Sequence, residues 1–341
     1  MKLHAEIVTV HTRHPFIIAR GGQSEWQTVW VRITDSDGAE GWGEAAPSRF
    51  YGETADSVMS AMTRFAPIVE RANAWSIEAV ERELERELRW NAAARCAISS
   101  ALHDLAAKRL GVPLYRMWGL DAAATPLSSF TIGIAPDDET LRARVREAAA
   151  YPILKIKLGS PRDAQTLRIV REEAPKATLR VDANAAWTAK QALGMLQTLT
   201  DVGVDMLEQP LPAHDLAGLR FVRERSPIPV VADESCLVAS DIPKLEGVVD
   251  GVNIKLAKCG SLREAMRMIA TARAHGMRVM CGCMIETTLG IAAAAHFSPL
   301  LDDADLDGAT LLADDPFSGP GIPDGRVTLG DAPGLGVTRR A

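Results

Sequence analysis

The sequence lacks several features that would assign it to a common class of protein. It has no run of about 18 apolar residues, the length that suggests a membrane-spanning helix, so no membrane partner is expected. Its net charge is −6, which leaves no excess of basic residues for nucleic acid. The first residues, MKLHAEIVTVHTRHPF, hold histidines and a glutamate where a signal peptide needs an unbroken apolar core. We therefore expect a mature, cytoplasmic protein.

Cysteine is scarce and shows no pairing pattern. The CGC segment is neither a redox nor a zinc C-x-x-C pair. Disulfides are rare in the cytosol, and we interpret these residues as reduced thiols. The five cysteines are Cys96, Cys236, Cys259, Cys281 and Cys283.

Two common catalytic motifs are also missing. No G-x-G-x-x-G follows an expected strand, so dinucleotide binding has no support. No G-x-S-x-G is present, so a serine nucleophile on a strand-to-helix elbow is not indicated.

The chain has 341 residues, of which 47% are hydrophobic and 24% are charged. This length and composition are typical of a globular protein larger than one ordinary domain.

The first 125 residues predict a mixed α and β unit. The segment QTVWVRITDSDGAEGWGEAAP reads as two strands around an Asp-Gly turn. Three segments with helical spacing follow, and the last ends at Gly111 just before Pro113, a stop signal.

From residue 126 a repeat begins. Short apolar runs that end in polar residues recur every 22 to 26 residues, with amphipathic segments between them. Eight strands that alternate with helices are the pattern of a parallel (β/α) barrel; an open, doubly wound sheet is the alternative, and the even spacing argues against it. The residues near the ends of the eight runs are Thr131, Lys157, Asp182, Glu208, Asp233, Lys255, Cys281 and Asp305.

Three carboxylates end three consecutive strands of this pattern. The carboxyl ends of barrel strands meet at one mouth, so Asp182, Glu208 and Asp233 should lie together. Unpaired carboxylates at that distance would repel one another. An oxygen-only site of this kind suits Mg²⁺, with Mn²⁺ as a substitute, so we expect one divalent metal ion.

Lysines flank these acids on both sides. In ILKIKL, Lys155 and Lys157 point to the same side of a strand that is otherwise apolar, where an unused charge would be costly. Lys255 lies on the sixth expected strand, across the barrel from the second. A neutral lysine on one face can remove a proton α to a metal-bound carboxylate, and a lysine on the other face can return one, which inverts the carbon.

The strand-end segments LKIKL, VDAN, LEQPL, ADES and NIKLAKCG resemble the enolase superfamily, muconate-lactonizing subgroup, over nearly the whole chain. Members use a lysine or histidine base with Mg²⁺. The resemblance implies a (β/α)7β barrel over residues 126–319 and an N-terminal α+β capping domain over 1–125, on which residues of about 320–341 pack back. It makes Lys157 and Lys255 the acid/base pair, and Lys155 a substrate-binding residue that supports the metal-bound carboxylate and the neighbouring lysine. Asn184 and Glu234 would orient the metal ligands.

The segment DLDG narrows the substrate. Asp305 and Asp307 lie two apart at the end of the eighth strand, where two carboxylates suit a substrate ammonium group. The segment is similar to that of dipeptide epimerases, which implies Mg²⁺-dependent epimerisation of the C-terminal residue of a dipeptide through an enediolate. An N-acylamino acid racemase or o-succinylbenzoate synthase of the same subgroup is the alternative. A sugar-acid dehydratase of the same superfamily would usually have a histidine base near the sixth and seventh strands, where this sequence has Lys255 and CGCM; His275 lies before the seventh strand, at an expected helix end.

The substrate side chain is less constrained by the sequence. Segment 15–27, PFIIARGGQSEWQ, is expected to be a loop over the barrel mouth, and Arg20 is its only cation. Arg20 would match a glutamate side chain, which favours L-Ala-D/L-Glu, a peptidoglycan fragment. Cys283 and Ile285 would line the other side of the site and tolerate apolar side chains, so a broader set of dipeptide substrates is also possible. A homo-oligomer is a further possibility that the sequence leaves open. Thr131, at the first strand end, is a further expected substrate contact.

Overall fold

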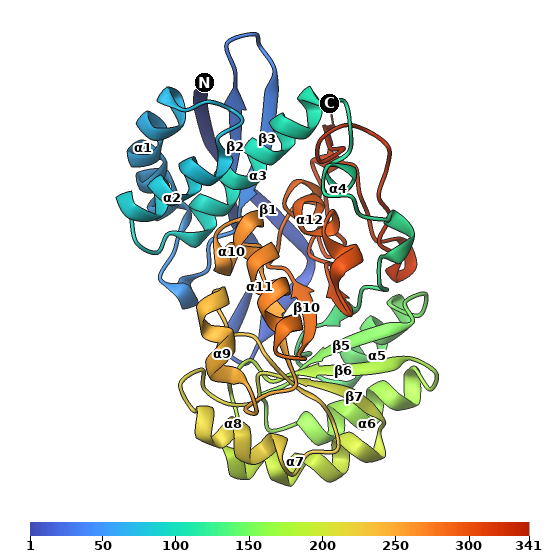
Figure 1. Ribbon diagram of the computed structural model, residues 1–341. Helices are drawn as coiled ribbons and strands as arrows, with labels where there is room; N and C mark the ends of the chain where they lie inside the picture. The colour runs from blue at the N-terminus through green and yellow to red at the C-terminus, as the bar shows by residue number, and fades with distance from the viewer. Residues whose placement is uncertain (341) are drawn as a thin grey trace.

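In the computed structural model, which describes residues 1–340, the chain begins with a three-stranded antiparallel sheet (Figure 1). Its strands are β1 (Lys2–Ile18), β2 (Gly21–Thr34) and β3 (Glu40–Ala45). Segment 15–27, expected as a loop, instead continues β1 and β2, with Ile18 paired to Gly21. Gly21 has φ = +102°, which allows a turn of only two residues, Ala19 and Arg20. The expectation of a loop was wrong because Gly21 allows a two-residue turn, so that the segment forms a β-hairpin.

Helices α1 (Ala55–Arg71) and α3 (Ala92–Arg109) lie on the strands of this sheet, and α2 (Ile77–Glu87) packs against these two helices. A capping box starts α1, in which the Thr54 side chain and the Ser57 side chain each accept a bond from the other's backbone. Helix α3 lies directly on β3, since a Cβ at Gly43 would stand 2.1 Å from a carbonyl oxygen of α3. The N-terminal part therefore has its own apolar core.

The second part is a barrel of eight parallel strands with consecutive strands as neighbours. Ser129 of the first unit donates a backbone bond to the Ala304 carbonyl of the last unit, which brings the two ends of the sheet together. The predicted fold class is confirmed, and every expected run is a strand. The strands are β4 (Phe130–Ile132), β5 (Ile153–Lys157), β6 (Thr178–Asp182), β7 (Val204–Glu208), β8 (Val230–Ala232), β9 (Gly251–Ile254), β10 (Arg278–Gly282) and β11 (Asp303–Asp305).

Helices and short turns follow each strand, and in Figure 1 helices α6, α7 and α8 cover the lower side of the barrel. Amphipathic faces such as that of α8 bury leucine and valine against the strands. The helices are α5 (Asp138–Glu147), α6 (Asp163–Glu173), α7 (Ala189–Asp201), α8 (Leu216–Arg223), α9 (Ile242–Leu245), α10 (Leu256–Cys259), α11 (Leu262–Ala274) and α12 (Thr288–Ala295), with 3-10 turns η3 (Ala239–Asp241) and η4 (Ser298–Leu300).

The C-terminal segment returns to the N-terminal part, and Figure 1 shows the C-terminus beside α4 (Leu114–Met117). The Leu335 amide donates to Asp104 of α3 at 2.7 Å, and the centres of the Phe317 and Trp30 rings lie 4.7 Å apart. The exact domain boundary near residue 125 stays a prediction. The remaining short elements are η1 (Arg49–Tyr51), η2 (Ala122–Ala124), β12 (Phe317–Ser318), η5 (Pro323–Gly325) and β13 (Thr338–Arg339).

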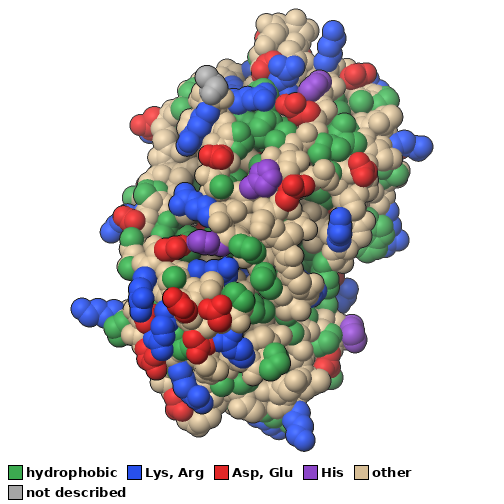
Figure 2. Space-filling view, turned by 180° about the vertical axis from the view of Figure 1, so that it is seen from behind, with side chains coloured by type: hydrophobic (Ala, Val, Ile, Leu, Met, Phe, Trp, Pro, Cys, Tyr) green, Lys and Arg blue, Asp and Glu red, His purple; other side chains and the backbone are tan. Residues whose placement is uncertain are grey.

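The surface carries charges of both signs. On the face in Figure 2, lysine and arginine side chains alternate with aspartate and glutamate, most densely at the lower left of the view. Within residues 1–340, no helix has both the length and the apolar character needed to cross a membrane.

Candidate active site

The three predicted acids meet at the carboxyl ends of neighbouring strands. Asp182 ends β6, Glu208 ends β7 and Asp233 directly follows β8. One oxygen of each lies within 4.8 Å of the others, and none of the three residues is more than 1% exposed. This all-oxygen, fully buried set fits a hard divalent cation such as Mg²⁺.

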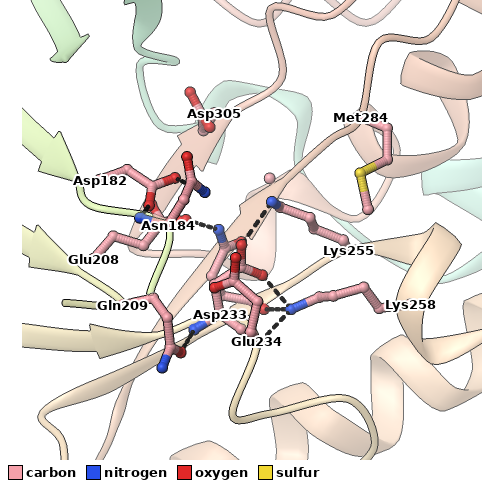
Figure 3. A network of polar contacts seen from close by, with 12 residues as sticks. Asp182, Asn184, Glu208, Gln209, Asp233, Glu234, Lys255, Lys258, Met284 and Asp305 are labelled. Carbon is pink, nitrogen blue, oxygen red and sulfur yellow. Dashed lines mark hydrogen bonds and ion pairs between the residues drawn. The ribbon is translucent and has the colours of Figure 1, made fainter. Parts of the chain in front are cut away.

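Lysines neutralise the triad in this structure. Nζ of Lys157 lies 2.6 Å from Oδ2 of Asp182. Nζ of Lys255 lies 2.8 Å from Oδ2 of Asp233 (Figure 3). Nζ of Lys155 lies 2.8 Å from Oε2 of Glu208. Lys157 and Lys255 come from the second and sixth of eight strands, so they approach the acids from opposite walls, as predicted.

The pKa values of the acids and lysines in this site are strongly shifted. Burial acts to raise the pKa of Asp182, but the Lys157 and Lys155 ammonium groups outweigh it and hold that pKa well below its usual range. Burial and the charge of Asp182 raise the pKa of Glu208 to about 7. Burial acts to lower the pKa of Lys255, yet Asp233 raises it well above normal. Such clusters of opposed shifts are typical of functional sites.

Lys258 is a buried residue of this site that the sequence reasoning missed. It lies on the short helix α10, is buried, and forms an ion pair with Oδ1 of Asp233 (Figure 3). Its Nζ also donates to the carbonyls of Asp233 at 2.7 Å and Asn253 at 2.9 Å. Lys258 and Lys255 thus bind different oxygens of the Asp233 carboxylate. The place of Lys258 three residues after Lys255, in NIKLAKCG, was the available signal.

Amide side chains orient the acids. The Asn184 side chain donates to Oδ2 of Asp182 at 3.1 Å, and the Asn253 side chain donates to Oε1 of Glu208 at 2.8 Å. Oε1 of Gln209 accepts from the Asp233 amide at 2.9 Å. Asn184 and Gln209 have φ of +45° and +33°, which is strained for residues other than glycine and is common next to active sites. Such partners set the direction of metal ligands.

Asp305 and Asp307 are both buried but differ in their surroundings. Oδ2 of Asp305 lies 2.7 Å from Nζ of Lys155, and burial opposed by this ammonium group leaves the pKa of Asp305 below normal. Oδ2 of Asp307 accepts from the Thr131 amide at 2.5 Å. Burial and the charge of Asp305 raise the pKa of Asp307 to about 7. The two carboxylates therefore do not form an equivalent pair.

A cavity of about 700 Å³ opens above these groups. All the residues predicted to contact substrate line it except Lys155, which is 1% exposed and lies beneath. Cys283 and Ile285 bound the cavity on the β10 side. Phe50 and Tyr51 of η1 bound it on the N-terminal side, and the sequence reasoning did not name them.

Arg20 lies at the hairpin turn and is already partnered. Its NH1 donates to the Asn184 carbonyl at 2.6 Å and lies 2.8 Å from Oε1 of Glu234. Its guanidinium carbon lies 4.0 Å from the centre of the Phe50 ring, a cation–π contact. Arg20 thereby connects the hairpin to Asn184 and Glu234, which lie just after two acids of the triad.

Sequence comparison matches two family models to the chain. Residues 2–119 match the N-terminal domain of mandelate racemase / muconate lactonizing enzyme, and residues 139–340 match the enolase C-terminal domain-like model. The chain belongs to the enolase superfamily. The assignment made from the strand-end motifs is confirmed, and the superfamily's Mg²⁺ chemistry fits the acidic triad.

Named relatives match this chain over nearly its whole length. An L-Ala-D/L-Glu epimerase of Bacteroides thetaiotaomicron is 40% identical, covering 96% of this chain and 85% of the relative. A hydrophobic dipeptide epimerase of a Flavobacteria bacterium is 39% identical over 99% of this chain and 98% of the relative. The crystal structure of a dipeptide epimerase from Enterococcus faecalis V583, complexed with Mg and L-Leu-L-Tyr, has a TM-score of 0.93 and 32% identity, with 99% of both chains covered.

Proposed function

We propose that this protein is a Mg²⁺-dependent dipeptide epimerase. The observation that carries the proposal is the placement of Lys157 and Lys255 on opposite walls around a buried acidic triad. Asp182, Glu208 and Asp233 hold the metal ion. Bound there, Mg²⁺ supplies positive charge that stabilises the negative charge developing on the substrate carboxylate as the α-proton leaves.

The chain's own residues then move the proton. One lysine, in its neutral form, removes the α-proton from one face of the C-terminal residue, and the ammonium group of the other lysine protonates the opposite face. Which lysine acts first depends on the configuration of the substrate. Burial of both amines, at 7% and 6% exposure for Lys157 and Lys255, keeps bulk water away from the exchanged proton.

Recognition of the dipeptide N-terminus is assigned to the DLDG segment. The carboxylates of Asp305 and Asp307 lie at the cavity, where a free ammonium group would find opposite charge. An N-acylated amino acid carries no such cation, so this arrangement favours a dipeptide over the substrate of an N-acylamino acid racemase. The same argument disfavours an o-succinylbenzoate synthase.

The side chain of the epimerised residue is the open part of the proposal. Arg20 lines the cavity and retains donors beyond NH1, which supports a glutamate, as in L-Ala-D/L-Glu from peptidoglycan. Ile285 and Phe50 line the same cavity, which supports apolar side chains. Relatives of both types exist, so we propose a set of dipeptides that includes Ala-Glu. The five free cysteines fit the reducing cytoplasm as the place of action.

Incubation of a dipeptide library in D₂O with Mg²⁺ tests the function. A single α-deuterium, detected by mass spectrometry, together with a mixture of configurations on a chiral column, is the expected result. Removal of Mg²⁺ by a chelator should stop both the incorporation of deuterium and the change of configuration. If N-acylamino acids exchange and free dipeptides do not, the racemase alternative replaces the proposal.

A further inference from the structure

The Lys155 ammonium group connects the triad to the DLDG segment. Its Nζ lies 2.8 Å from Oε2 of Glu208 and 2.7 Å from Oδ2 of Asp305, with Oδ2 of Asp182 at 3.4 Å. Lys155 is 1% exposed, so water does not screen these contacts. One ammonium group is thus shared between two carboxylates of the triad and one carboxylate outside it.

Both oxygens of Asp305 already have close partners. Its Oδ2 faces Lys155, and its Oδ1 accepts from the hydroxyls of Ser129 at 2.6 Å and Thr131 at 3.3 Å. Asp307 is different. Its Oδ2 accepts from the Thr131 amide, whereas its Oδ1 has only the Cys283 thiol, a weak donor, at 4.0 Å.

We propose that Asp305 is a positioning residue of the metal centre: it competes with Glu208 and Asp182 for the Lys155 ammonium group, so that Mg²⁺ affinity depends on Asp305 through Lys155. Asp307 is then the carboxylate that receives the substrate ammonium group. Only this second assignment rests on the proposed function, because the first concerns metal binding alone.

The physical reason is competition between two cations. A buried ammonium group must keep an anionic partner, since leaving it unpaired is costly. Without the Asp305 charge, Lys155 would bind only Glu208 and Asp182. The carboxylate oxygens of these two residues are the ones that the metal ion needs. Mg²⁺ would then have to displace a stronger ion pair. With Asp305 present, Lys155 keeps a partner when the metal ion takes the triad.

Titration of the full-length, substrate-free protein with Mg²⁺ by isothermal calorimetry tests the proposal. Asp305→Asn should weaken the Kd by about 10-fold or more, the equivalent of about 1.4 kcal/mol. Asp307→Asn, the matched control two residues along the chain, should change the Kd by less than about 3-fold, because its carboxylate contacts no lysine. Equal effects of the two substitutions would overturn the proposal, since they would reflect only the general loss of negative charge.

A double-mutant cycle with Lys155→Met identifies the route. If Asp305 acts through Lys155, the Asp305→Asn effect on the Kd should vanish in the Lys155→Met background. An unchanged effect in that background would also overturn the proposal. Circular dichroism shows whether the Lys155→Met proteins are folded.

If Lys155→Met does not fold, enzyme kinetics can test whether Asp305 acts through the metal ion. The activity of Asp305→Asn should recover at high Mg²⁺ with a nearly normal KM for dipeptide. Asp307→Asn should keep a raised KM at any Mg²⁺ concentration. A raised KM in Asp305→Asn that excess Mg²⁺ does not correct would contradict the positioning role. The calorimetric titration contains no dipeptide, so its outcome is independent of whether the epimerase proposal holds.

Discussion

Nζ of Lys255 lies 2.8 Å from Oδ2 of Asp233, so one of the two lysines proposed as the acid/base pair is ion-paired to a ligand of the expected metal ion. Lys157 has the same relation to Asp182, at 2.6 Å. The two pairs face one another across the barrel mouth. A metal ion at the triad would draw on the same carboxylates and weaken their hold on both lysines. Metal binding and lysine basicity are therefore linked by shared oxygens.

The first prediction concerns these two lysines. Lys157→Ala and Lys255→Ala should each abolish epimerisation, with an increase in the barrier of about 5 kcal/mol or more, as for residues that act together. Each variant should still exchange the α-proton of one configuration, because the remaining lysine faces that side. Proton NMR in D₂O on the separate LL and LD dipeptides measures this. Epimerisation at near wild-type rate in either variant would rule out the two-base assignment.

The second prediction concerns metal binding and stability. Mg²⁺ binds only the folded triad, so Mg²⁺ at 100 times its Kd should stabilise the protein by about 2.7 kcal/mol. A thermal melt with and without chelator should show a higher Tm with Mg²⁺. In Asp233→Asn the shift should be lost, because one ligand charge is missing. Replacement of the exposed Asp331, far along the chain from the triad, is the control and should leave the shift intact.

The third prediction concerns pH and Glu286, which lies beside the start of α12. Burial raises the pKa of Glu286 to about 7, from 4.5 when unfolded. The folded state therefore binds more protons between these values, and the contribution of Glu286 to stability is complete below pH 4.5 and is lost as the pH rises through about 7. Urea unfolding at several pH values should show that the free energy of unfolding of the wild type falls by up to about 3 kcal/mol, relative to Glu286→Gln, between pH 4.5 and about 7.

The paired comparison removes other titrations from this result. Lowered pKa values, such as that of Asp302, change stability in the opposite direction at lower pH, and they are common to both proteins. A constant difference between wild type and Glu286→Gln from pH 4.5 to 8 would show that Glu286 stays ionised in the folded protein.

The fourth prediction concerns the substrate N-terminus. In Asp307→Asn the free oxygen loses its charge with little change of volume. Free dipeptides should lose kcat/KM by about 1.5–3 kcal/mol, the range for a hydrogen bond to a charged group, whereas N-acetylated dipeptides should change little. Parallel assays of both substrates at saturating Mg²⁺ measure the difference. Equal losses would show that Asp307 does not contact the ammonium group.

The barrel and its central acids could be predicted because both follow from periodicity. Strand ends repeat along the chain, and parallel strands bring their carboxyl ends together, so Asp182, Glu208 and Asp233 had to meet if the strands were correct. The superfamily motifs then pointed to Lys157 and Lys255 by resemblance.

Other features depend on contacts that no local pattern encodes. Lys258 reaches Asp233 because the chain turns into α10 directly after β9. The ion pair between Lys155 and Asp305 joins strands 150 residues apart in sequence. The hairpin at Gly21 was mistaken for a loop because its glycine-rich, polar sequence is typical of both. Side-chain pairing between distant segments and tight turns therefore needed the structure.

The last prediction concerns Arg20 and the substrate side chain. Glu234 and the Asn184 carbonyl bind only NH1 of Arg20, and the side chain is 31% exposed at the cavity. The other guanidinium nitrogens can therefore donate to a glutamate side chain, while Glu234 holds the group in place. Arg20→Met should cost Ala-Glu about 1.5–3 kcal/mol in kcat/KM and leave Ala-Leu nearly unchanged.

A second outcome would assign Arg20 a different role. Arg20 also connects the hairpin to η1 through Phe50 and to the barrel through Glu234. If closing the cavity were its main task, Arg20→Met would lower kcat/KM for Ala-Glu and Ala-Leu alike. Phe50→Leu serves as the matched variant, because it removes the ring contact and keeps the guanidinium group. A selective loss in Arg20→Met with no selective loss in Phe50→Leu supports glutamate recognition; equal losses for all dipeptides in both variants would exclude it.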